Sequence, residues 1–483
     1  MKKRIASILL VLVMALSLIP TTVWAVWEPT VSTFADLKRV IASSSDGYET
    51  KITIDGTIVI SETLNLKSED SDYGRNVSKY NVTIVGKDEN SKLVRAEGFT
   101  EALFVVAGTR TYYGSESLYY SSLTLRDIII DGGSDKTTAT SAAIRVRSQG
   151  TLNLEGNTVI RNCKSSDNDG GAIFMGSHDT PINGGQAILN ISGNVILENN
   201  EAGYGGVVYI RDYGYSGPFT PSKLTMTGGT MRNNTARKAG GAIYSHDIKT
   251  TYRTEDVPLK LLGGTIQNNT AGIKGGGVYF TGLAACTVGG ALNITGNTQG
   301  ESKTASNLHV GEEAENPHIY ISYGDDKLTS AASIGVNSDL VPTKQIVYGT
   351  TATNIFFSDR TDCALVPNGN SLDLKATDTH THCPCNNTTS DRYYHNHAAN
   401  TTWTGINSLA AIKSSGSYYL LNDVTIDDTW ALDLNKSDVS LCLNGHKLII
   451  NANYNRPCIS IPGYRTLTLT DCGRTAGQIV AQG

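Results

Sequence analysis

The chain has 483 residues, a formal net charge of −5, 49 glycines and 12 prolines, with no collagen period. This acidic balance gives no electrostatic basis for a nucleic-acid or anionic-membrane partner, which excludes both classes. The abundance of Gly, Asn, Thr and Ile favours a β-rich chain with many tight turns and little helix.

The N-terminus has the pattern of a secretory signal peptide. Residues 2–4 are basic, residues 5–19 form an apolar run of 15 residues, and small residues lead to Ala25. A membrane anchor is the alternative interpretation, but a spanning helix needs roughly 20 apolar residues, and no later stretch is long and apolar enough to span a bilayer. We therefore expect cleavage after Ala25, export, and a mature charge of −8.

A short capping helix is predicted directly after Thr33. Thr33 stands in the N-cap position, and Asp36 occupies the matching position of a capping box. The apolar face of this helix comprises Phe34, Leu37, Val40 and Ile41. Irregular early coils are then expected at residues 51–60, 82–86, 103–106 and 123–131. An open solenoid needs such a cover, because its first strand edge is otherwise unpaired.

Three short motifs recur along the centre of the chain. Glycine-pair segments start 35 residues apart, at 170–174, 205–209, 240–244 and 275–279. Alternating apolar and polar segments that end in glycine occupy 152–156, 189–193, 224–228, 259–263 and 292–296. Segments with asparagine after an apolar residue occupy 160–162, 197–200, 231–236 and 266–271. A fixed period of this kind predicts a solenoid, with one coil for each repeat.

The alternation within each segment predicts which side chains form the core. Leu224 and Met226 should point inward, and Thr225 should point outward. The corner asparagines have a structural interpretation, because an amide can bond to the equivalent residue one coil away and asparagine tolerates the left-handed region. The predicted ladder consists of Asn199, Asn233 and Asn268.

The Gly-Gly-Ala-Ile segment at 240–243, together with Asn-Asn-Thr-Ala at 233–236, resembles the repeats of polymorphic outer-membrane proteins and of Firmicutes β-helix cell-surface proteins. The resemblance covers residues 141–310 and implies an all-β, right-handed parallel β-helix. In the outer-membrane family the third motif usually carries Phe, whereas this chain has Ile, Leu or Met there. The resemblance therefore supports the fold more directly than host-cell binding.

Four regions are expected along the chain. They are a signal peptide at 1–25, a parallel β-helix at 26–376, a His- and Cys-containing linker or small insert at 377–404, and the start of a second β-helix module at 405–483, which we expect to be truncated. Closing coils of the first module are predicted at 306–310, 319–322 and 332–336. For the second module, a short capping helix is predicted at 406–412 and early coils at 441–445, 458–461 and 467–472.

The linker carries candidate zinc ligands. Cys383, Cys385, His395 and His397, with His380 and His382 nearby, supply the donor types of a tetrahedral zinc site. The alternative is a solvated linker whose cysteines form a disulfide or stay reduced, since one proline is a shorter spacer than structural zinc sites use. In the second module, the spacing of Cys442, Cys458 and Cys472 permits a disulfide between two of them.

Candidate acids for catalysis are the pair Asp127 and Asp131 and the pair Asp167 and Asp169, although an Asp in a turn commonly has only a turn role. No Ser/His/Asp or Cys/His arrangement is visible locally, and active sites on solenoids assemble from distant coils. We therefore assign no catalytic residue. A polysaccharide lyase or glycoside hydrolase, with calcium as a possible cofactor, is the alternative function.

Tyrosines gather in segments that we predict to be loops. Exposed tyrosine can stack on sugar rings or anchor a protein interface, or it can pack on the adjacent coil. The candidate ligand-binding residues are Tyr112, Tyr113, Tyr204, Tyr213 and Tyr215. We predict a secreted or cell-surface, non-catalytic adhesin whose partners are extracellular glycans or proteins of host or neighbouring cells. A structural spacer within a larger surface protein is the second alternative.

Overall fold

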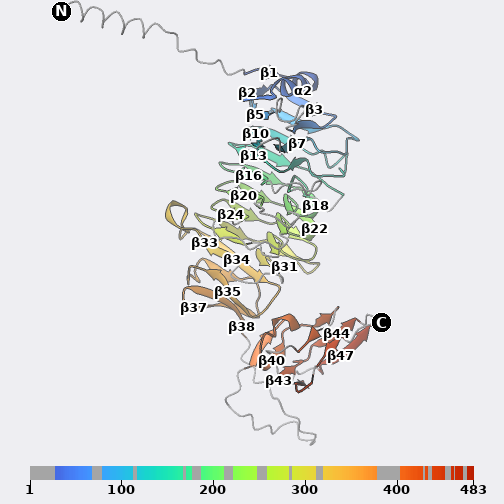
Figure 1. Cartoon of the computed structure of the whole chain (residues 1–483), viewed down its shortest axis with the longest axis vertical. Helices are drawn as coiled ribbons and strands as arrows, with labels where there is room; N and C mark the ends of the chain where they lie inside the picture. The colour runs from blue at the N-terminus through green and yellow to red at the C-terminus, as the bar shows by residue number, and fades with distance from the viewer. Residues whose placement is uncertain are drawn as a thin grey trace, which may run out of the picture.

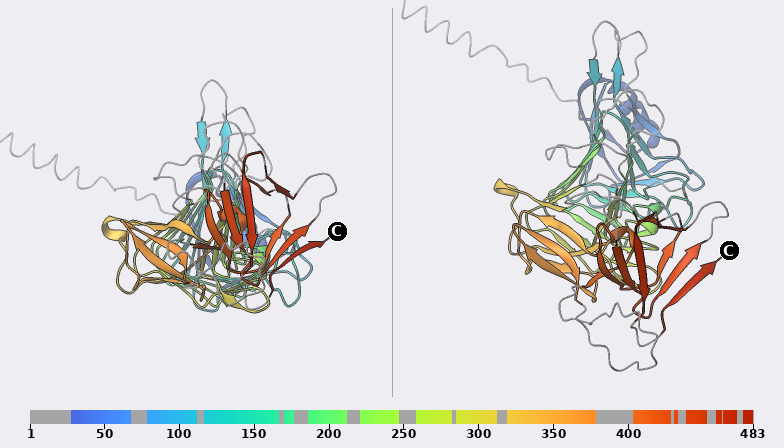
Figure 2. Two further views of the ribbon diagram at one scale, coloured as in Figure 1. Left: turned by 90° about the horizontal axis from the view of Figure 1, so that it is seen from below. Right: turned by 60° about the horizontal axis from the view of Figure 1, so that its bottom comes forward.

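The structure is a computed structural model that describes residues 28–67, 79–111, 117–166, 170–176, 186–211, 221–246, 258–281, 285–311, 319–377, 403–427, 430–432, 438–451, 458–461, 463–471 and 476–482. Its strands form two separate bodies, and within each body the strands stack on one another (Figure 1). The first is a long column that starts at a short helix, and the second lies beside the far end of that column (Figure 2). We call them the long solenoid and the short solenoid.

One face of the long solenoid is a 13-stranded sheet that is parallel until its last strands. In order across the sheet, its strands are β1 (Thr30–Val31), β2 (Asp46–Ile54), β5 (Lys79–Gly86), β10 (Ser121–Arg126), β13 (Gly150–Glu155), β16 (Ile188–Ile191), β20 (Lys223–Met226), β24 (Leu259–Leu261), β28 (Cys286–Val288), β33 (Ile319–Ile321), β35 (Thr343–Tyr348), β38 (Ser371–Ala376) and β37 (Cys363–Asn368).

Two further parallel ladders meet in β34 (Ser333–Ser338), which pairs with strands of both. The first contains β3 (Thr57–Ile60), β6 (Lys92–Arg95), β11 (Ile129–Asp131), β14 (Val159–Arg161), β17 (Ile196–Glu198), β21 (Thr230–Arg232), β25 (Thr265–Gln267), β29 (Asn293–Thr295) and β36 (Phe356–Ser358). The second contains β4 (Leu64–Lys67), β7 (Phe104–Ala107), β12 (Ile144–Val146), β15 (Ile173–Met175), β19 (Val208–Arg211), β23 (Ile243–His246), β27 (Val278–Thr281) and β32 (Leu308–Val310).

Shorter strands line one corner and one side of the column. The corner sheet contains β18 (Glu201–Tyr204), β22 (Thr235–Ala239), β26 (Thr270–Ala271), β30 (Thr298–Gln299) and β31 (Thr304–Ala305). An antiparallel hairpin of β8 (Thr109–Thr111) and β9 (Ser117–Tyr119) projects from the side (Figure 2). A 3-10 turn, η1, spans Gly324–Asp326.

The register confirms one coil for each repeat. Leu189 pairs with Leu224, and Leu224 pairs with Leu259, in adjacent coils. All three side chains are fully buried, whereas Thr225 points away from the core, as predicted. Burial of each such leucine stabilises the fold by roughly 1.5–3 kcal/mol relative to exposure. The core is therefore a continuous column of stacked aliphatic side chains.

The capping helix is confirmed as α2 (Phe34–Ser43). The Thr33 hydroxyl oxygen accepts a hydrogen bond from the Asp36 backbone N–H at 3.2 Å and donates to the Asp36 carboxylate at 2.7 Å. Leu37, Val40 and Ile41 are buried, and the helix lies against β2, β3 and β4. The helix thus covers the first coil.

The asparagine ladder is shifted by one residue from our prediction. Asn199, Asn233 and Asn268 do adopt the left-handed conformation, with φ of 55°, 56° and 55°. The amides that bond from coil to coil, however, belong to the next residues, Asn200, Asn234 and Asn269, which are buried, and the buried Asn297 and Asn307 continue the same series of bonds. The first asparagine turns the chain, and this turn places the second side chain inside the corner.

Each ladder asparagine binds the next one in the same way. The backbone N–H and Nδ2 of Asn234 both donate to Asn269 Oδ1, at 3.0 and 2.8 Å, and Nδ2 also donates to the Leu197 carbonyl at 2.9 Å. The last donor is Asn307, whose N–H and Nδ2 bond to the two carboxylate oxygens of Asp359 at 2.5 and 2.6 Å. All the amides therefore point toward the same end of the column.

Replacement of Asn234 by alanine is expected to lower the free energy of unfolding by about 2–4 kcal/mol, because it leaves buried groups of Asn200 and Asn269 with fewer partners. Chemical denaturation measures this loss. The matched control is Asn233→Gly, which alters an exposed left-handed residue and should change stability by only a few tenths of a kcal/mol. Equal losses in the two variants would contradict the ladder.

The far end of the long solenoid is finished by antiparallel pairing. β38 pairs antiparallel with both β35 and β37, a closure that the sequence did not predict. A change from parallel to antiparallel strands ends the stacking of coils and reduces the exposed edge.

The short solenoid is also built from parallel pairs. Its strands are β39 (Trp403–Ile406), β40 (Gly416–Leu420), β41 (Val424–Ile426), β42 (Trp430–Ala431), β43 (Asp438–Cys442), β44 (Lys447–Asn451), β45 (Ile459–Ser460), β46 (Thr466–Thr470) and β47 (Gln478–Gln482). The capping helix predicted at 406–412 is wrong. This segment holds the end of β39 and one 3-10 turn, η2 (Leu409–Ala411), and it buries Ile406, Leu409 and Ile412 in the core without a longer helix.

Candidate functional site

Most of the predicted site residues lie outside the described part of the chain. This holds for Tyr112, Tyr113, Tyr213 and Tyr215, for Asp167 and Asp169, for Cys472, and for the zinc candidates Cys383, Cys385, His395 and His397 with His380 and His382. Within the described ranges, no group of three or more His, Cys, Asp or Glu side chains could hold a metal ion. Cys442 and Cys458 are not joined to each other by a disulfide.

Tyr204 lies in a strand and not in a loop, which corrects our prediction for that segment. It belongs to β18, and its ring stacks on Tyr244 with centroids 4.7 Å apart. Lys238 Nζ lies 4.9 Å from the centroid of the same ring. Tyr204 is thus part of an aromatic cluster at the corner of the column, and a role in ligand binding stays a prediction.

Asp127 and Asp131 hold neighbouring coils together. The Asp127 carboxylate accepts hydrogen bonds from the backbone N–H and Nδ2 of Asn157, at 2.8 and 3.0 Å. Asp131 pairs with Arg161 at 3.0 Å, one coil further on. Both carboxylates have structural partners, which favours the turn role over acid–base catalysis.

The buried cysteines have the character of core residues. Burial raises the pKa of Cys163 to about 12, although the nearby Arg95 opposes the shift, and burial also raises the pKa of Cys286. A thiol with such a pKa carries almost no thiolate at neutral pH, so neither cysteine is suited to nucleophilic catalysis.

An aromatic column runs along the outward side of the second ladder. Phe174, Tyr209, Tyr244, Tyr279 and His309 stand at equivalent positions of adjacent coils, with successive ring centroids 5.2–5.7 Å apart. All are buried. Aromatic pairs at these distances stabilise by about 0.5–1.5 kcal/mol beyond their burial.

The column ends at the carboxylate of Asp339, just beyond β34. One oxygen contacts His309 Nε2 at 3.0 Å, and the other contacts the Tyr279 hydroxyl at 2.9 Å and Lys274 Nζ at 2.8 Å. Burial opposes ionisation of Asp339, but the hydrogen bonds and charges of His309 and Lys274 outweigh it, so that the pKa of Asp339 lies well below its usual range. We call these four residues the Asp339 network.

Ser306 extends the Asp339 network into a Ser–His–Asp chain that was not visible in the sequence. The Ser306 hydroxyl lies 3.0 Å from His309 Nδ1. Ser306 is 0 % exposed and His309 is 3 % exposed, so no substrate carbonyl can reach the hydroxyl in this structure. The arrangement therefore supports the fold and not acyl transfer, which requires an accessible nucleophile.

The same segment holds the short solenoid in place. Asn407 Nδ2 donates to the Asp339 carbonyl at 2.9 Å, and Asn407 Oδ1 accepts from the Val341 N–H at 2.7 Å. Both bonds join the turn after β39 to the turn after β34. The Asp339 network thus positions the segment on which the second body docks.

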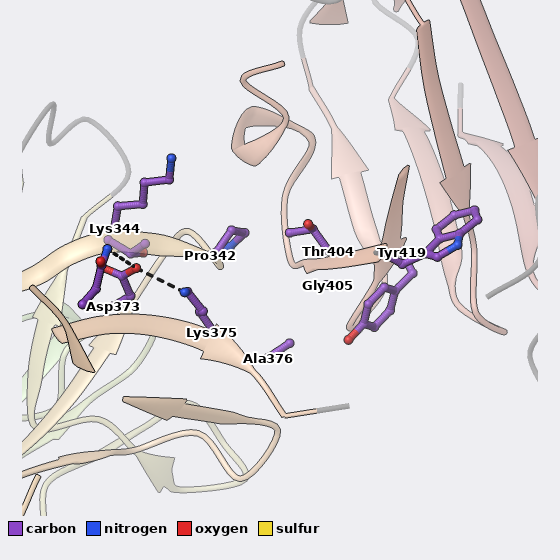
Figure 3. Close-up of a pocket in the computed structure, with 11 residues that line it drawn as sticks. Pro342, Lys344, Asp373, Lys375, Ala376, Thr404, Gly405 and Tyr419 are labelled. Carbon is purple, nitrogen blue, oxygen red and sulfur yellow. Dashed lines mark hydrogen bonds and ion pairs between the residues drawn. The ribbon is translucent and has the colours of Figure 1, made fainter. Parts of the chain in front are cut away.

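A cleft of about 430 Å³ lies between the two bodies at this junction. Residues of β35 and β38 face residues of β39 and β40 across it (Figure 3). The solenoid wall comprises Pro342, Thr343, Lys344, Asn368, Asp373, Lys375 and Ala376, and the facing wall comprises Trp403, Thr404, Gly405 and Tyr419. This volume is typical of pockets for small ligands, which are roughly 300–1,000 Å³.

The charges of the cleft are unevenly compensated. Asp373 is buried and accepts hydrogen bonds from the Gln345 N–H at 2.8 Å and from Asn368 Nδ2 at 3.0 Å. Lys375 Nζ lies 3.3 Å from the same carboxylate (Figure 3). Lys344 is exposed and forms no ion pair within the described ranges. The cleft therefore combines the partly exposed Trp403 and the buried Tyr419 with one uncompensated positive charge.

Gly405 sets the closest approach of the two walls. A Cβ added there would lie 2.7 Å from Ala376 Cβ and 2.8 Å from the Tyr419 ring and hydroxyl. We expect Gly405→Val to destabilise the junction by about 1–3 kcal/mol, the usual cost of overpacking. Urea denaturation followed by tryptophan fluorescence measures this, since Trp403 and Trp430 both lie in the short solenoid. Thr404→Val is the control. If both variants lose the same free energy of unfolding, the close approach at Gly405 does not limit the stability of the junction.

The fold defines an all-β parallel β-helix protein. Residues 229–246 match the Chlamydia polymorphic membrane protein repeat, and they include β21, the Asn233–Asn234 corner and the glycine pair. This match supports the predicted resemblance over one repeat. No curated protein and no solved structure matches the chain. None of the helices in the described ranges has the length and apolar character needed to cross a membrane.

Proposed function

We propose that this protein is a secreted or cell-surface, non-catalytic β-helix protein of adhesin type, which binds extracellular glycans or proteins of host or neighbouring cells. The cleft between the two solenoids carries this proposal, because it joins Trp403 and Tyr419 to polar groups of the opposite wall. Aromatic and polar groups in one concave site are typical of ligand recognition.

Two further observations support the proposal. The matched repeat takes its name from membrane proteins of Chlamydia, in agreement with a surface location, and the N-terminal residues have the pattern of a signal peptide. In the described ranges, the candidate acids Asp127 and Asp131 are held by structural partners, and Ser306 is buried. These placements favour binding over turnover.

The test uses the mature full chain in two parallel assays. The first measures binding to a glycan array and to intact cells, and the second measures release of reducing ends or unsaturated products from pectic, hyaluronan-like and mucin substrates, with and without calcium. We expect binding without product release. Product release would overturn the non-catalytic assignment, and the absence of any binding to glycans or cells would favour the spacer alternative.

A further inference from the structure

We infer that the cleft between the two solenoids binds a carboxylated sugar, such as a uronic or sialic acid residue of an extracellular glycan. This inference rests on the proposed function and names the ligand class of its site.

The charge of the cleft is the first argument. The Asp373 carboxylate is compensated by Lys375 at 3.3 Å and by the hydrogen bonds from Gln345 and Asn368. Lys344 then supplies one positive charge on the rim, without a carboxylate partner in the described ranges. One uncompensated cation matches a monoanion such as a sugar carboxylate, whereas a phosphate dianion would be left partly unneutralised.

The shape and chemistry of the walls are the second argument. Trp403 contributes partly exposed aromatic surface from the short solenoid, next to the buried Tyr419, and Pro342 contributes an apolar ring from the opposite wall. Aromatic side chains provide an apolar face with a polar tip, which suits a pyranose ring with its hydroxyl groups. Thr404 and Asn368 add a hydroxyl and an amide, which can donate to or accept from those hydroxyls.

The junction geometry is the third argument. Neither wall alone encloses the site, and the bonds from Asn407 to Asp339 and Val341 keep the walls together. Lys344 is separated from Val341 by only two residues, so the same turn that docks the short solenoid also places the cation. A ligand that touches both walls should therefore stabilise their contact.

The test titrates the full mature chain with oligosaccharides that contain galacturonate, glucuronate or N-acetylneuraminate, and with the methyl ester of each one. Tryptophan fluorescence reports binding, because Trp403 lines the cleft. We expect the acids to bind more tightly than the matched esters. Lys344→Gln should weaken binding of the acids by about ten-fold, which corresponds to the loss of one charge-assisted hydrogen bond, and should leave the esters unaffected. Lys327→Gln, at an exposed lysine outside the cleft, is the control.

The outcomes separate this inference from the proposed function. Equal binding of acids and esters, unchanged by Lys344→Gln, would overturn the carboxylated-sugar assignment while leaving glycan binding intact. Failure of every acid and ester to bind would also overturn it, and the array and cell assays would then decide the proposed function. Weaker binding in both lysine variants would show a general charge effect and no site.

Discussion

Replacement of Gly241 by alanine is expected to lower the free energy of unfolding of the long solenoid by more than about 4 kcal/mol. A Cβ at this position would lie 1.9 Å from the Gly276 carbonyl oxygen and 2.8 Å from the Thr270 N atom. Both atoms belong to the backbone of the adjacent coil, so no side-chain rotation can relieve the contact.

The effect should be large because the contact repeats. A Cβ at Gly206 would lie 2.2 Å from the Gly241 carbonyl oxygen, and one at Gly276 would lie 2.2 Å from the Thr298 carbonyl oxygen. A coil that moves to accept alanine therefore disturbs its neighbours. Chemical denaturation followed by far-ultraviolet circular dichroism measures the loss.

Gly463→Ala is the matched control for Gly241→Ala. No atom lies within 4 Å of a Cβ at Gly463, and the φ of Gly463 is not in the left-handed region. The free energy of unfolding of Gly463→Ala should therefore differ from that of the wild type by less than about 0.5 kcal/mol. A loss below 1 kcal/mol for Gly241→Ala would mean that the coils are further apart than the structure places them.

Replacement of Asp339 by asparagine is expected to cost about 3–5 kcal/mol at neutral pH, which is typical when one partner of a buried ion pair is removed. The substitution keeps the shape of the side chain but removes the negative charge that Lys274 and His309 contact. It also replaces the carboxylate oxygen that accepts the hydrogen bond of the Tyr279 hydroxyl by a weaker, uncharged acceptor. Because the Asp339 carbonyl also binds Asn407, the junction should loosen in the same variant.

This cost should depend on pH with a defined sign. The pKa of Asp339 is lower in the folded than in the unfolded chain, so its charge stabilises the fold above the unfolded value of about 3.9. That contribution is lost as the pH falls from there toward the folded pKa. The difference between the wild type and Asp339→Asn should therefore be constant near neutrality and shrink below about pH 4.

Asp55→Asn is the control for Asp339→Asn, because Asp55 forms an exposed pair with Lys87 at 2.7 Å. It should cost less than about 1 kcal/mol. A similar cost in the two variants, or a difference from wild type that is as large at pH 2 as at neutral pH, would contradict the buried network.

The coil could be predicted from the sequence because the patterns that specify it are local and recur in each repeat. The 35-residue period and the alternation of Leu224 and Met226 with Thr225 define both the stacking and the inward face. The roles of the two asparagines of each corner could not be assigned in this way, because they are the same residue type and either one suits a turn. Only the backbone shows that Asn233 is left-handed and exposed while Asn234 is buried.

The cleft and the Asp339 network could not be predicted, because their members are distant in sequence. Lys274 and Asp339 are 65 positions apart, and Asn407 is 68 positions from Asp339. No repeat relates these residues, so periodicity places none of them together. The signal in the sequence was the placement of His309 three residues after Ser306 in a predicted closing coil. That pattern does not indicate which acid completes the Ser–His–Asp arrangement.

The parallel ladders determine how the molecule responds to a pulling force. Backbone hydrogen bonds between coils run along the long axis, so tension on that axis loads them in line and opens one coil at a time, without sliding all strands together. Each opened repeat of 35 residues releases slack on the order of 115 Å, against about 4.8 Å in the folded stack. A cell held through this column would thus be held by an extensible tether, whose resistance is that of a single coil at each step.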